Sequence, residues 1–288
     1  MKELSRNIIG TTTGKETFEY AWRDIALYAA GVGAKDNETQ YQYEVGLKAL
    51  PTYGVVPYWG TFGITPHRDL PRNVTFSLNL DQEGSFHMAH KLILHQPIAP
   101  MGARLTIEDI ITEVYDRNGK GAVVRSELTA YDESGAKVFT NVGDTIFGAY
   151  SVPSAPPYPK STVVFPEREP DFTEKDFVAP NQHLLYRLSG DTNRLHVDLE
   201  EARQRGFDRP IMQGLCSFGF ACRLAVRDLV PGQPERIKSI EAQMRNPLFP
   251  GTEIELSLWK AGDGRAYFRL MDLQNSRPVL EKGEIDWE

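Results

Sequence analysis

The sequence predicts an α+β protein built from two similar halves, each with a helix packed against a bent antiparallel sheet. The first observation is an internal echo. The segment PIAPMGARLTIEDI at Pro97 resembles PLFPGTEIELSL at Pro247, and each presents Pro-x-x-Pro, a glycine and an alternating strand. The second is that a hairpin signal follows each segment, Asn118-Gly119 in the first half and Gly262-Asp263-Gly264 in the second. The third is the set of six prolines within residues 151–171, which is typical of a linker.

These observations divide the chain of 288 residues into an N-terminal half (1–150), a linker (151–171) and a C-terminal half (172–288). A chain of this length suits two domains or one duplicated domain.

Alternating apolar residues predict the strands on both sides of the hairpin turns. In the first half, one face carries Val124, Leu128 and Ala130, and a further turn is expected at residues 132–135. The second half alternates before and after its turn, at Ile254, Leu256 and Leu258 and then at Ala266, Phe268 and Leu270. Each half is therefore expected to hold a long antiparallel sheet.

Helices are expected ahead of each sheet. Residues 17–31 form one apolar stripe, at Phe18, Trp22, Ile25 and Ala29. In the second half, Asp198 is a predicted N-cap and Gly206 a predicted stop for a short helix. A second helix is expected from about Gly214 to Pro231, and its apolar circumference predicts that the sheet buries it.

Composition excludes several functional classes. The net charge of −7 argues against nucleic acid as a main partner, and no apolar run approaches the ~20 residues of a membrane span. Cys216 and Cys222 lie six residues apart in one expected helix and should not form a disulfide. The first residues lack a secretory h-region, and the final IDWE does not match a peroxisomal S-K-L address, so we expect a cytoplasmic protein.

A short loop gathers the residues that suit acid–base chemistry. Asp191, Asn193 and His196 follow a predicted strand, HLLYRLS (183–189), and precede the capped helix. An imidazole can take a proton from water, a carboxylate can orient that water and pass the proton on, and an amide can hold it. The alternative interpretation is structural, because Asp and Asn often form turns by bonding only their own backbone.

The sequence around this loop resembles a known family. YRLSGDTNRLHVD (186–198) and GFDRPIMQGLCSFGFACRLAV (206–226) look like the signature of the MaoC-like, or hydratase 2, family of (R)-specific 2-enoyl-CoA hydratases. The first half, with FEYAWRDIALYAAGVGA (18–34) and YEVGLKALPTYGVV (43–56), resembles the family's N-terminal partner domain. The resemblance implies a double hot-dog fold, which consists of two repeats of a long helix wrapped by a curved antiparallel sheet. It also implies a hydro-lyase of fatty acid metabolism, such as β-oxidation.

The resemblance also assigns roles to residues of the loop and the following helix. It implies that Asp191 and His196 are the catalytic dyad and that Asn193 binds the catalytic water. It implies that the backbone N–H of Gly214 faces the thioester oxygen. An N–H at a helix N-terminus is well placed to stabilise the enolate-like oxygen that forms when water adds to the double bond.

Four further residues are expected to contact the substrate or its coenzyme A. Gln213 and Leu215 flank the position of the oxyanion, and Arg223 and Arg245 stand in otherwise apolar segments where they could bind phosphates. Coenzyme A is then part of the substrate, and no cofactor or metal is expected.

The sequence departs from the family pattern at three positions. The family usually has proline where this chain has Arg194 and Leu199, and histidine where it has Gln213. The first half has no equivalent of G-D-x-N-x-x-H, because GAKDNETQ around Asp36 has another spacing. We therefore expect that half to shape the acyl pocket without catalysing the reaction, and we expect a homodimer.

Two other signals are weaker. His87, His90 and His95 lie in an expected strand that would point them to both faces, which disfavours one tetrahedral metal site. Cys216 is expected to be a buried structural residue rather than a nucleophile. Alternatives to the hydratase are an acyl-CoA thioesterase on the same fold and a non-enzymatic acyl-CoA-binding partner subunit.

Overall fold

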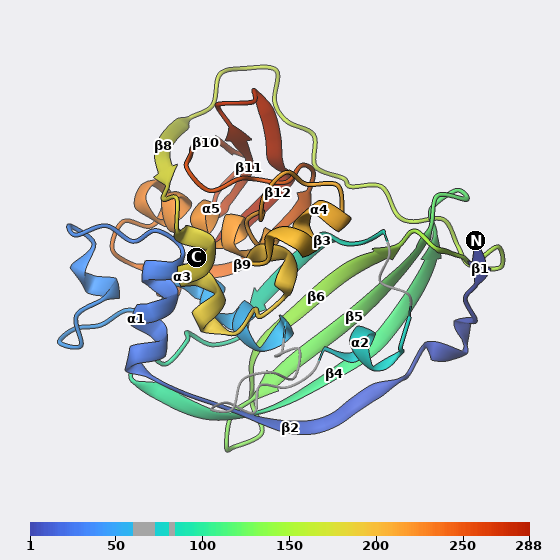
Figure 1. Cartoon of the computed structure of the whole chain (residues 1–288). Coiled ribbons are helices and arrows are strands. Elements are labelled where there is room, and N and C mark those ends of the chain that lie inside the picture. Colours follow the sequence, from blue (N-terminus) through green and yellow to red (C-terminus); the bar gives the residue numbers. More distant parts are fainter. Residues whose placement is uncertain (60–72, 81–83) are drawn as a thin grey trace.

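Ten strands form one continuous antiparallel sheet across both halves of the molecule (Figure 1). The computed structural model describes residues 1–59, 73–80 and 84–288. The strands of the N-terminal half are β2 (Thr12–Ala21), β3 (Ser85–Leu94), β4 (Gly102–Asp116), β5 (Ala122–Tyr131) and β6 (Lys137–Phe147). Those of the C-terminal half are β8 (Phe172–Val178), β9 (Ile237–Met244), β10 (Thr252–Lys260), β11 (Arg265–Asp272) and β12 (Arg277–Trp287).

The strand order confirms the predicted duplication. It runs β2-β4-β5-β6-β3 in the first half and, read inward from the other edge, β8-β10-β11-β12-β9 in the second. In both halves the first strand lies at the outer edge and the second strand lies at the junction. There β3 pairs with β9, with Leu92 opposite Ile240, so the two halves share one sheet.

The predicted turns and strand faces are also confirmed. Asn118 and Gly119 both adopt positive φ, 51° and 72°, in the turn between β4 and β5, as a two-residue hairpin turn requires. The alternating apolar residues of β10 and β11 are fully buried, at Ile254, Leu256, Leu258, Ala266, Phe268 and Leu270.

The long helix α5 (Gly214–Leu229) is buried along nearly its whole length, as predicted. It packs against β9, β10 and β12 of the curved C-terminal sheet. Cys216 and Cys222 are both buried and free. Burial raises the pKa of the Cys216 thiol well above its ordinary value, which supports its interpretation as a structural residue.

The predicted helix over residues 17–31 is wrong in its first part. The helix α1 (Trp22–Gly31) begins only after β2 ends at Ala21. Phe18 and Tyr20 are buried as alternate residues of β2, which pairs with β4. These residues form a strand because they pair with residues far away in the chain. An apolar stripe at helical spacing does not reveal such pairing.

The N-terminal sheet is covered differently from the C-terminal one. The helix α1 lies beside α3 and α5, whereas η3 (Pro51–Trp59) packs on β3 and β6. Gly54 allows this approach, because a Cβ there would lie 3.1 Å from Leu92 Cδ1 and 3.3 Å from Phe139 Cγ. With Pro57 inside it, the segment forms a 3₁₀ helix instead of a long α-helix.

The remaining elements are short. The helices are η1 (Arg6–Ile8), η2 (Thr39–Tyr41), α2 (Val74–Ser77), α3 (Gln182–Tyr186), η4 (Arg187–Ser189), η5 (Arg194–His196), α4 (Leu199–Gln204) and η6 (Pro234–Arg236). β1 (Lys2–Glu3) and β7 (Tyr150–Ser151) form a small parallel pair. Residues 152–171, between β7 and β8, contain no helix or strand. Within the described residues, no helix has the length and apolarity needed to cross a bilayer.

Candidate active site

Helical residues precede the loop of residues 190–196, so the predicted strand HLLYRLS (183–189) is wrong. Residues 182–189 form α3 and η4, with Gln182, Tyr186 and Ser189 buried. Their spacing of four and then three residues is that of one helix face. On the other side of the loop, the predicted cap is confirmed. The Asp198 carboxylate accepts hydrogen bonds from Glu200 N at 2.9 Å and Glu201 N at 3.3 Å and begins α4.

Within the loop, two side chains hold the backbone. Asp191 Oδ1 accepts a hydrogen bond from Asn193 N at 3.1 Å, and Asn193 Oδ1 accepts one from Leu195 N at 3.1 Å. Asn193 thereby caps the short helix η5, which ends at His196. Asp191 and Asn193 therefore do form turns by bonding the nearby backbone. Both residues also line one cavity.

The orientation of His196 is set by its Nδ1 atom, which donates to the carbonyl oxygen of Ile211 at 2.9 Å. A neutral imidazole that donates from Nδ1 carries its free acceptor at Nε2. That nitrogen faces Asp191, with 3.9 Å between His196 Nε2 and Asp191 Oδ2. This separation is too long for a direct hydrogen bond and short enough for one water molecule to contact both atoms.

Burial changes the acidity of the Asp191 carboxyl. Asp191 and His196 are 9% and 7% exposed. Removal from water raises the pKa of Asp191 above its ordinary value, and the nearby His196 partly offsets this effect. A carboxyl with a raised pKa is better able to exchange a proton near neutral pH.

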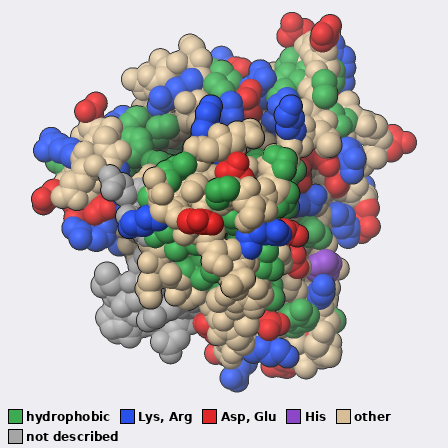
Figure 2. All heavy atoms as spheres, turned by 90° about the vertical axis from the view of Figure 1, so that its right-hand side faces the viewer, with side chains coloured by type: hydrophobic (Ala, Val, Ile, Leu, Met, Phe, Trp, Pro, Cys, Tyr) green, Lys and Arg blue, Asp and Glu red, His purple; other side chains and the backbone are tan. Residues whose placement is uncertain are grey.

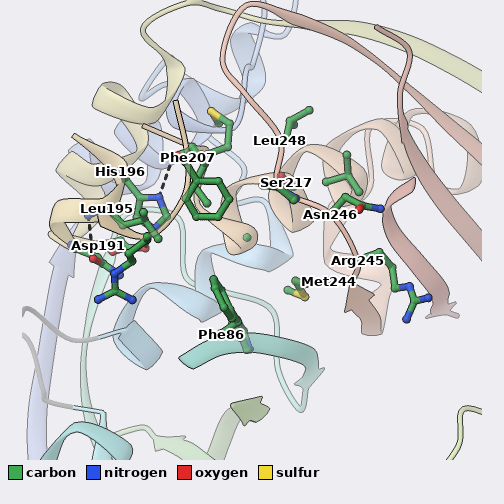
Figure 3. A pocket seen from close by; sticks show the side chains of 18 of the residues that line it. Phe86, Asp191, Leu195, His196, Phe207, Ser217, Met244, Arg245, Asn246 and Leu248 are labelled. Carbon is green, nitrogen blue, oxygen red and sulfur yellow. Dashed lines mark hydrogen bonds and ion pairs between the residues drawn. The ribbon is translucent and has the colours of Figure 1, made fainter. Parts of the chain in front are cut away.

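Both side chains lie in the wall of a cavity of about 270 Å³ (Figure 3). Its walls come from the loop of residues 190–196, the segment between α4 and α5, the start of α5, the end of β9 with the residues after it, β12, and two strands of the N-terminal half. The lining residues include Leu195, Phe207, Ile211, Met212, Ser217, Met244, Asn246, Pro247, Leu248, Val279 and Leu280. These walls are mainly apolar, with a few polar groups, as is usual for a small-molecule site.

The N-terminus of α5 also reaches the cavity, through Gly214 and Ser217. The Gly214 amide is in the first turn, where a helix provides no acceptor for its N–H groups. Gln213 precedes it, and its carbonyl accepts from Cys216 N at 3.1 Å. The positive end of the helix dipole therefore lies at the cavity wall.

The four residues expected to contact substrate differ in position. Arg245 lines the cavity, with its Nε 3.6 Å from Glu281 Oε2. Gln213 and Leu215 are buried and lie outside the cavity lining. The side-chain amide of Gln213 instead donates to the carbonyl of His183 at 3.1 Å.

Arg223 does not fit the expectation of a phosphate ligand, and we remove it from the candidate site. Its side chain is fully buried, and it lies outside the cavity lining. It donates to Val32 O at 2.9 Å and to Glu38 Oε2 at 2.6 Å, and it also pairs with Asp176. The contacts with Val32 and Glu38 join the two halves, and together the three contacts engage all three guanidinium nitrogens. An arginine in an apolar segment can thus mark a buried ion pair as well as a binding site.

The sequence led us to expect that the N-terminal half shapes the pocket, but it did not indicate which residues of that half line the cavity. Ser85, Phe86 and His87 of β3 and Thr145 of β6 line it. Arg205, which stands just after α4, lines it too and pairs with Glu201 at 3.0 Å. No local motif marks the four residues of the N-terminal half, because only the pairing of β3 with β9 brings them to the loop.

The histidines of β3 do not point to opposite faces as a regular strand would require. A bulge between His87 and Ala89 shifts the register. The rings of His87 and His90 consequently lie 5.2 Å apart, edge to face. Burial lowers the pKa of His87 to about 4, so this ring is neutral at pH 7. His95 lies past the strand and contacts the Thr140 hydroxyl at 3.0 Å.

Comparison with known proteins agrees with this geometry. A family model described as a MaoC like domain matches residues 162–281, and one described as an MFE-2 hydratase 2 N-terminal domain matches residues 18–148. The 3-hydroxyacyl-thioester dehydratase Y of Mycobacterium tuberculosis is 32% identical, over 99% of this chain and 98% of that protein. The chain belongs to the MaoC-like dehydratase family. The predicted resemblance and the hydro-lyase class are confirmed.

Other relatives of the family support the same assignment. An enoyl-CoA hydratase of Mycobacterium tuberculosis is 31% identical over 85% of each chain. The crystal structure of a MaoC-like dehydratase from Phytophthora capsici has a TM-score of 0.88 and 27% identity, covering 99% of this chain and 98% of that one. A further Mycobacterium tuberculosis structure, titled as having a double hot-dog fold, has a TM-score of 0.59 at 15% identity and supports the fold alone.

The chain spans less than half of some longer relatives. It covers 46% of the peroxisomal multifunctional enzyme type 2 of Drosophila melanogaster and 35% of the one from Mus musculus, at 29% identity in both. The family assignment therefore concerns only the portion of these longer proteins that the chain matches.

Proposed function

We propose that this protein reversibly hydrates trans-2-enoyl-CoA thioesters to (R)-3-hydroxyacyl-CoA, with Asp191 and His196 as the catalytic pair. The observation that carries the proposal is the geometry of these two groups. His196 Nε2 and Asp191 Oδ2 face each other across 3.9 Å at the wall of a mainly apolar cavity. One water molecule between them would have an acceptor on the imidazole and a second partner on the carboxyl.

The chemistry follows from that placement. The water oxygen bonds to C3 of the enoyl group while His196 Nε2 accepts one of its protons, and the electron pair of the double bond moves toward the thioester carbonyl. The Asp191 carboxyl, whose pKa burial raises, then gives a proton to C2, and the proton on His196 returns to Asp191. Asn193, which also lines the cavity, has a side-chain amide N–H₂ group that can help to hold the water.

The start of α5 supplies the electrostatic part of the proposal. In the transition state, negative charge collects on the thioester oxygen. The N–H of Gly214 has no acceptor within the helix and lies at the cavity wall, so we assign it as the donor to that oxygen.

The remaining walls suit the other parts of an acyl-CoA. The apolar side chains of Phe86, Leu195 and Leu248 suit the acyl chain, which gives the N-terminal half a share in shaping its pocket. Arg205 and Arg245 are our candidates for the phosphates of coenzyme A. Arginines at the cavity itself are needed because the described residues form no broad basic surface on the face in Figure 2. Basic and acidic side chains are interspersed over that face, and the net charge of the protein is −7. Addition of water involves no redox step, so we propose no cofactor.

The test is an assay of absorbance at the conjugated thioester, with crotonyl-CoA and longer enoyl-CoA substrates. Addition of water should lower the absorbance to an equilibrium value, and only an (R)-specific 3-hydroxyacyl-CoA dehydrogenase should oxidise the product. Folded protein without activity on any chain length would sink the proposal. Release of free thiol would favour the thioesterase alternative. Acyl-CoA binding without turnover that stays intact in Asp191→Ala and His196→Ala would favour a non-enzymatic acyl-CoA-binding subunit.

Two properties remain proposals that the relatives do not decide. Some relatives are named as peroxisomal, whereas we propose a cytoplasmic protein. We also propose a homodimer, which light scattering on the purified chain would test.

A further inference from the structure

The C-terminal end of α1 is completed by side chains from the other half of the molecule. Gln182 Nε2 donates to the carbonyl oxygens of Ala30 at 2.9 Å and Gly31 at 2.6 Å. The thiol of Cys216 lies 3.4 Å from the same Gly31 oxygen. The Ala30 oxygen also accepts from Gly33 N at 3.1 Å. The Gly31 oxygen lies at the helix end, where the helix supplies no donor, so Gln182 and Cys216 satisfy a carbonyl that would otherwise be unpaired.

The donor Gln182 stands at the start of the segment that leads to the catalytic loop. It is the first residue of α3, and Asp191 follows directly after η4 and Gly190. The side chain of Gln182 is buried, and α3 and η4 both pack on α1. The chain that presents the catalytic pair is thus attached to a helix of the half that carries no catalytic group (Figure 1).

The backbones of the two helices approach closely at Gly31. A Cβ at this position would lie 3.2 Å from the Cα atom of Tyr186, which is backbone and cannot rotate away. One turn earlier in α1, the Tyr28 ring lies 5.9 Å from the Tyr186 ring. Gly31 and Gln182 therefore fix both the distance between α1 and α3 and their relative position.

The contact continues from Tyr186 to Asp191. Tyr186 is the last residue of α3, and only η4 and Gly190 separate it from Asp191. Its ring is buried, and burial raises the pKa of the phenol well above its ordinary value. A shift of Tyr186 relative to α1 would move the carboxyl that faces His196 across 3.9 Å.

A purely structural explanation would assign these contacts to general cohesion of the two halves. Arg223 already provides that cohesion through Val32 and Glu38, and it does so from α5. Gln182 differs because it acts on α3, the element that directly precedes the loop. Catalysis is sensitive to misplacement of about 1 Å even in a protein that stays folded.

We propose that Gln182 is a positioning residue, through which α1 of the N-terminal half holds the Asp191 loop in register for the reaction. This rests on the proposed hydratase function. It gives the N-terminal half a second role, besides lining the cavity, in a reaction whose chemical groups all belong to the C-terminal half.

Two variants of the full chain test the proposal from both sides of the contact. Gln182→Met keeps the side-chain volume and removes the donors, and Gly31→Ala pushes on the Tyr186 backbone. We expect kcat on crotonyl-CoA to fall roughly 10- to 100-fold in each, with KM changed less than about twofold. The pH profile of kcat should shift, because a displaced loop alters the burial of Asp191.

The matched control is Val114→Ala, a buried residue in the separate apolar cluster near β1 and β7. It should lower the melting temperature without changing kcat or the pH profile. If kcat falls with the melting temperature in the control as it does in the two variants, the role of Gln182 is only to stabilise the fold. Unchanged kcat and pH profile in both variants would also overturn the proposal.

A second readout does not depend on turnover. Amide hydrogen exchange over residues 187–196 should become faster in Gln182→Met and Gly31→Ala and stay as in the unmodified protein in Val114→Ala. If the unmodified protein proves inactive, the hydratase proposal fails while exchange still tests the contact. If the protein is active and exchange and kcat are unchanged, the positioning proposal alone fails.

Discussion

His196 Nδ1 lies 2.9 Å from the carbonyl oxygen of Ile211, and this contact leaves Nε2 as the nitrogen that faces Asp191. In the proposed reaction, this contact gives the base a fixed direction. One nitrogen of the ring holds it in place, and the other is the one that we propose accepts a proton from water.

The first prediction uses this separation. In His196→Asn the side-chain amide can still donate to Ile211, but no base remains at the position of Nε2. We expect kcat to fall on the order of 100- to 10,000-fold with little change in melting temperature. The measurements are initial rates on crotonyl-CoA and a thermal melt, and a loss smaller than tenfold in folded protein would contradict the assignment.

The second prediction concerns the cost of keeping Asp191 buried. Its folded-state pKa is raised by burial, so between its unfolded and folded pKa values the native state binds more protons than the unfolded state. Stability is therefore lost as pH rises through that window. Asp191→Asn removes this loss along with the proton donor. We expect it to be nearly inactive yet to melt higher than the unmodified protein at neutral pH, with the difference shrinking toward about pH 4. A variant that melts lower at neutral pH would contradict this account.

These two residues also show what the sequence could predict. The spacing of Asp191, Asn193 and His196, the cap at Asp198 and the hairpin turns depend on neighbours within a few residues, and the structure places them as expected. The duplicated sheet could be predicted for a similar reason, because the alternation of apolar residues along one strand indicates which of its faces is buried.

What the sequence could not predict depends on distant partners. Phe18 belongs to a strand because β4 pairs with it, and Arg223 is an internal ion-pair residue because Glu38 and Asp176 meet it. Phe86 and His87 line the cavity only because β3 joins β9. No local pattern carries that information.

The third prediction isolates the backbone donor at the start of α5. Proline is well tolerated at the first position of a helix, and Gln213, with φ −64° and ψ 137°, already has the conformation that a following proline requires. Gly214→Pro should therefore keep the helix while removing the N–H. We expect a loss in kcat of about 100- to 1,000-fold.

The matched control for this variant is Gly214→Ala, which restores the N–H. Its Cβ would lie 3.3 Å from Met244 Cγ, the flexible part of a side chain that can shift. We expect less than about a tenfold loss in kcat for alanine. Equal losses in the two variants would assign the effect to crowding instead of the missing donor.

The fourth prediction tests the arginines at the cavity. Arg245→Ala and Arg205→Ala should raise KM for crotonyl-CoA with little change in kcat, because they remove binding that the substrate and transition state share. The ratio of KM in the variant to KM in the unmodified protein should be smaller at high salt. Salt already screens the attraction between these arginines and the substrate phosphates in the unmodified protein. Arg265→Ala, which breaks a pair with Asp286 on the sheet away from the cavity, is the control and should leave KM unchanged.

The last prediction lies away from the cavity, at Asp109 on β4. Burial raises the pKa of this carboxyl to about 7, while a hydrogen bond from Val74 N at 2.7 Å partly lowers it. From the ordinary value of 3.8 up to about 7 the native state holds a proton that the unfolded chain has released, so stability falls as pH rises across that range. Asp109→Asn keeps an acceptor for Val74 and cannot ionise. The melting temperature of the variant relative to the unmodified protein should therefore rise steadily from about pH 4 to about pH 7 and level off above it. Activity at neutral pH should be unchanged, because Asp109 does not line the cavity. A difference in melting temperature that is constant with pH would show that burial of Asp109 does not perturb its titration.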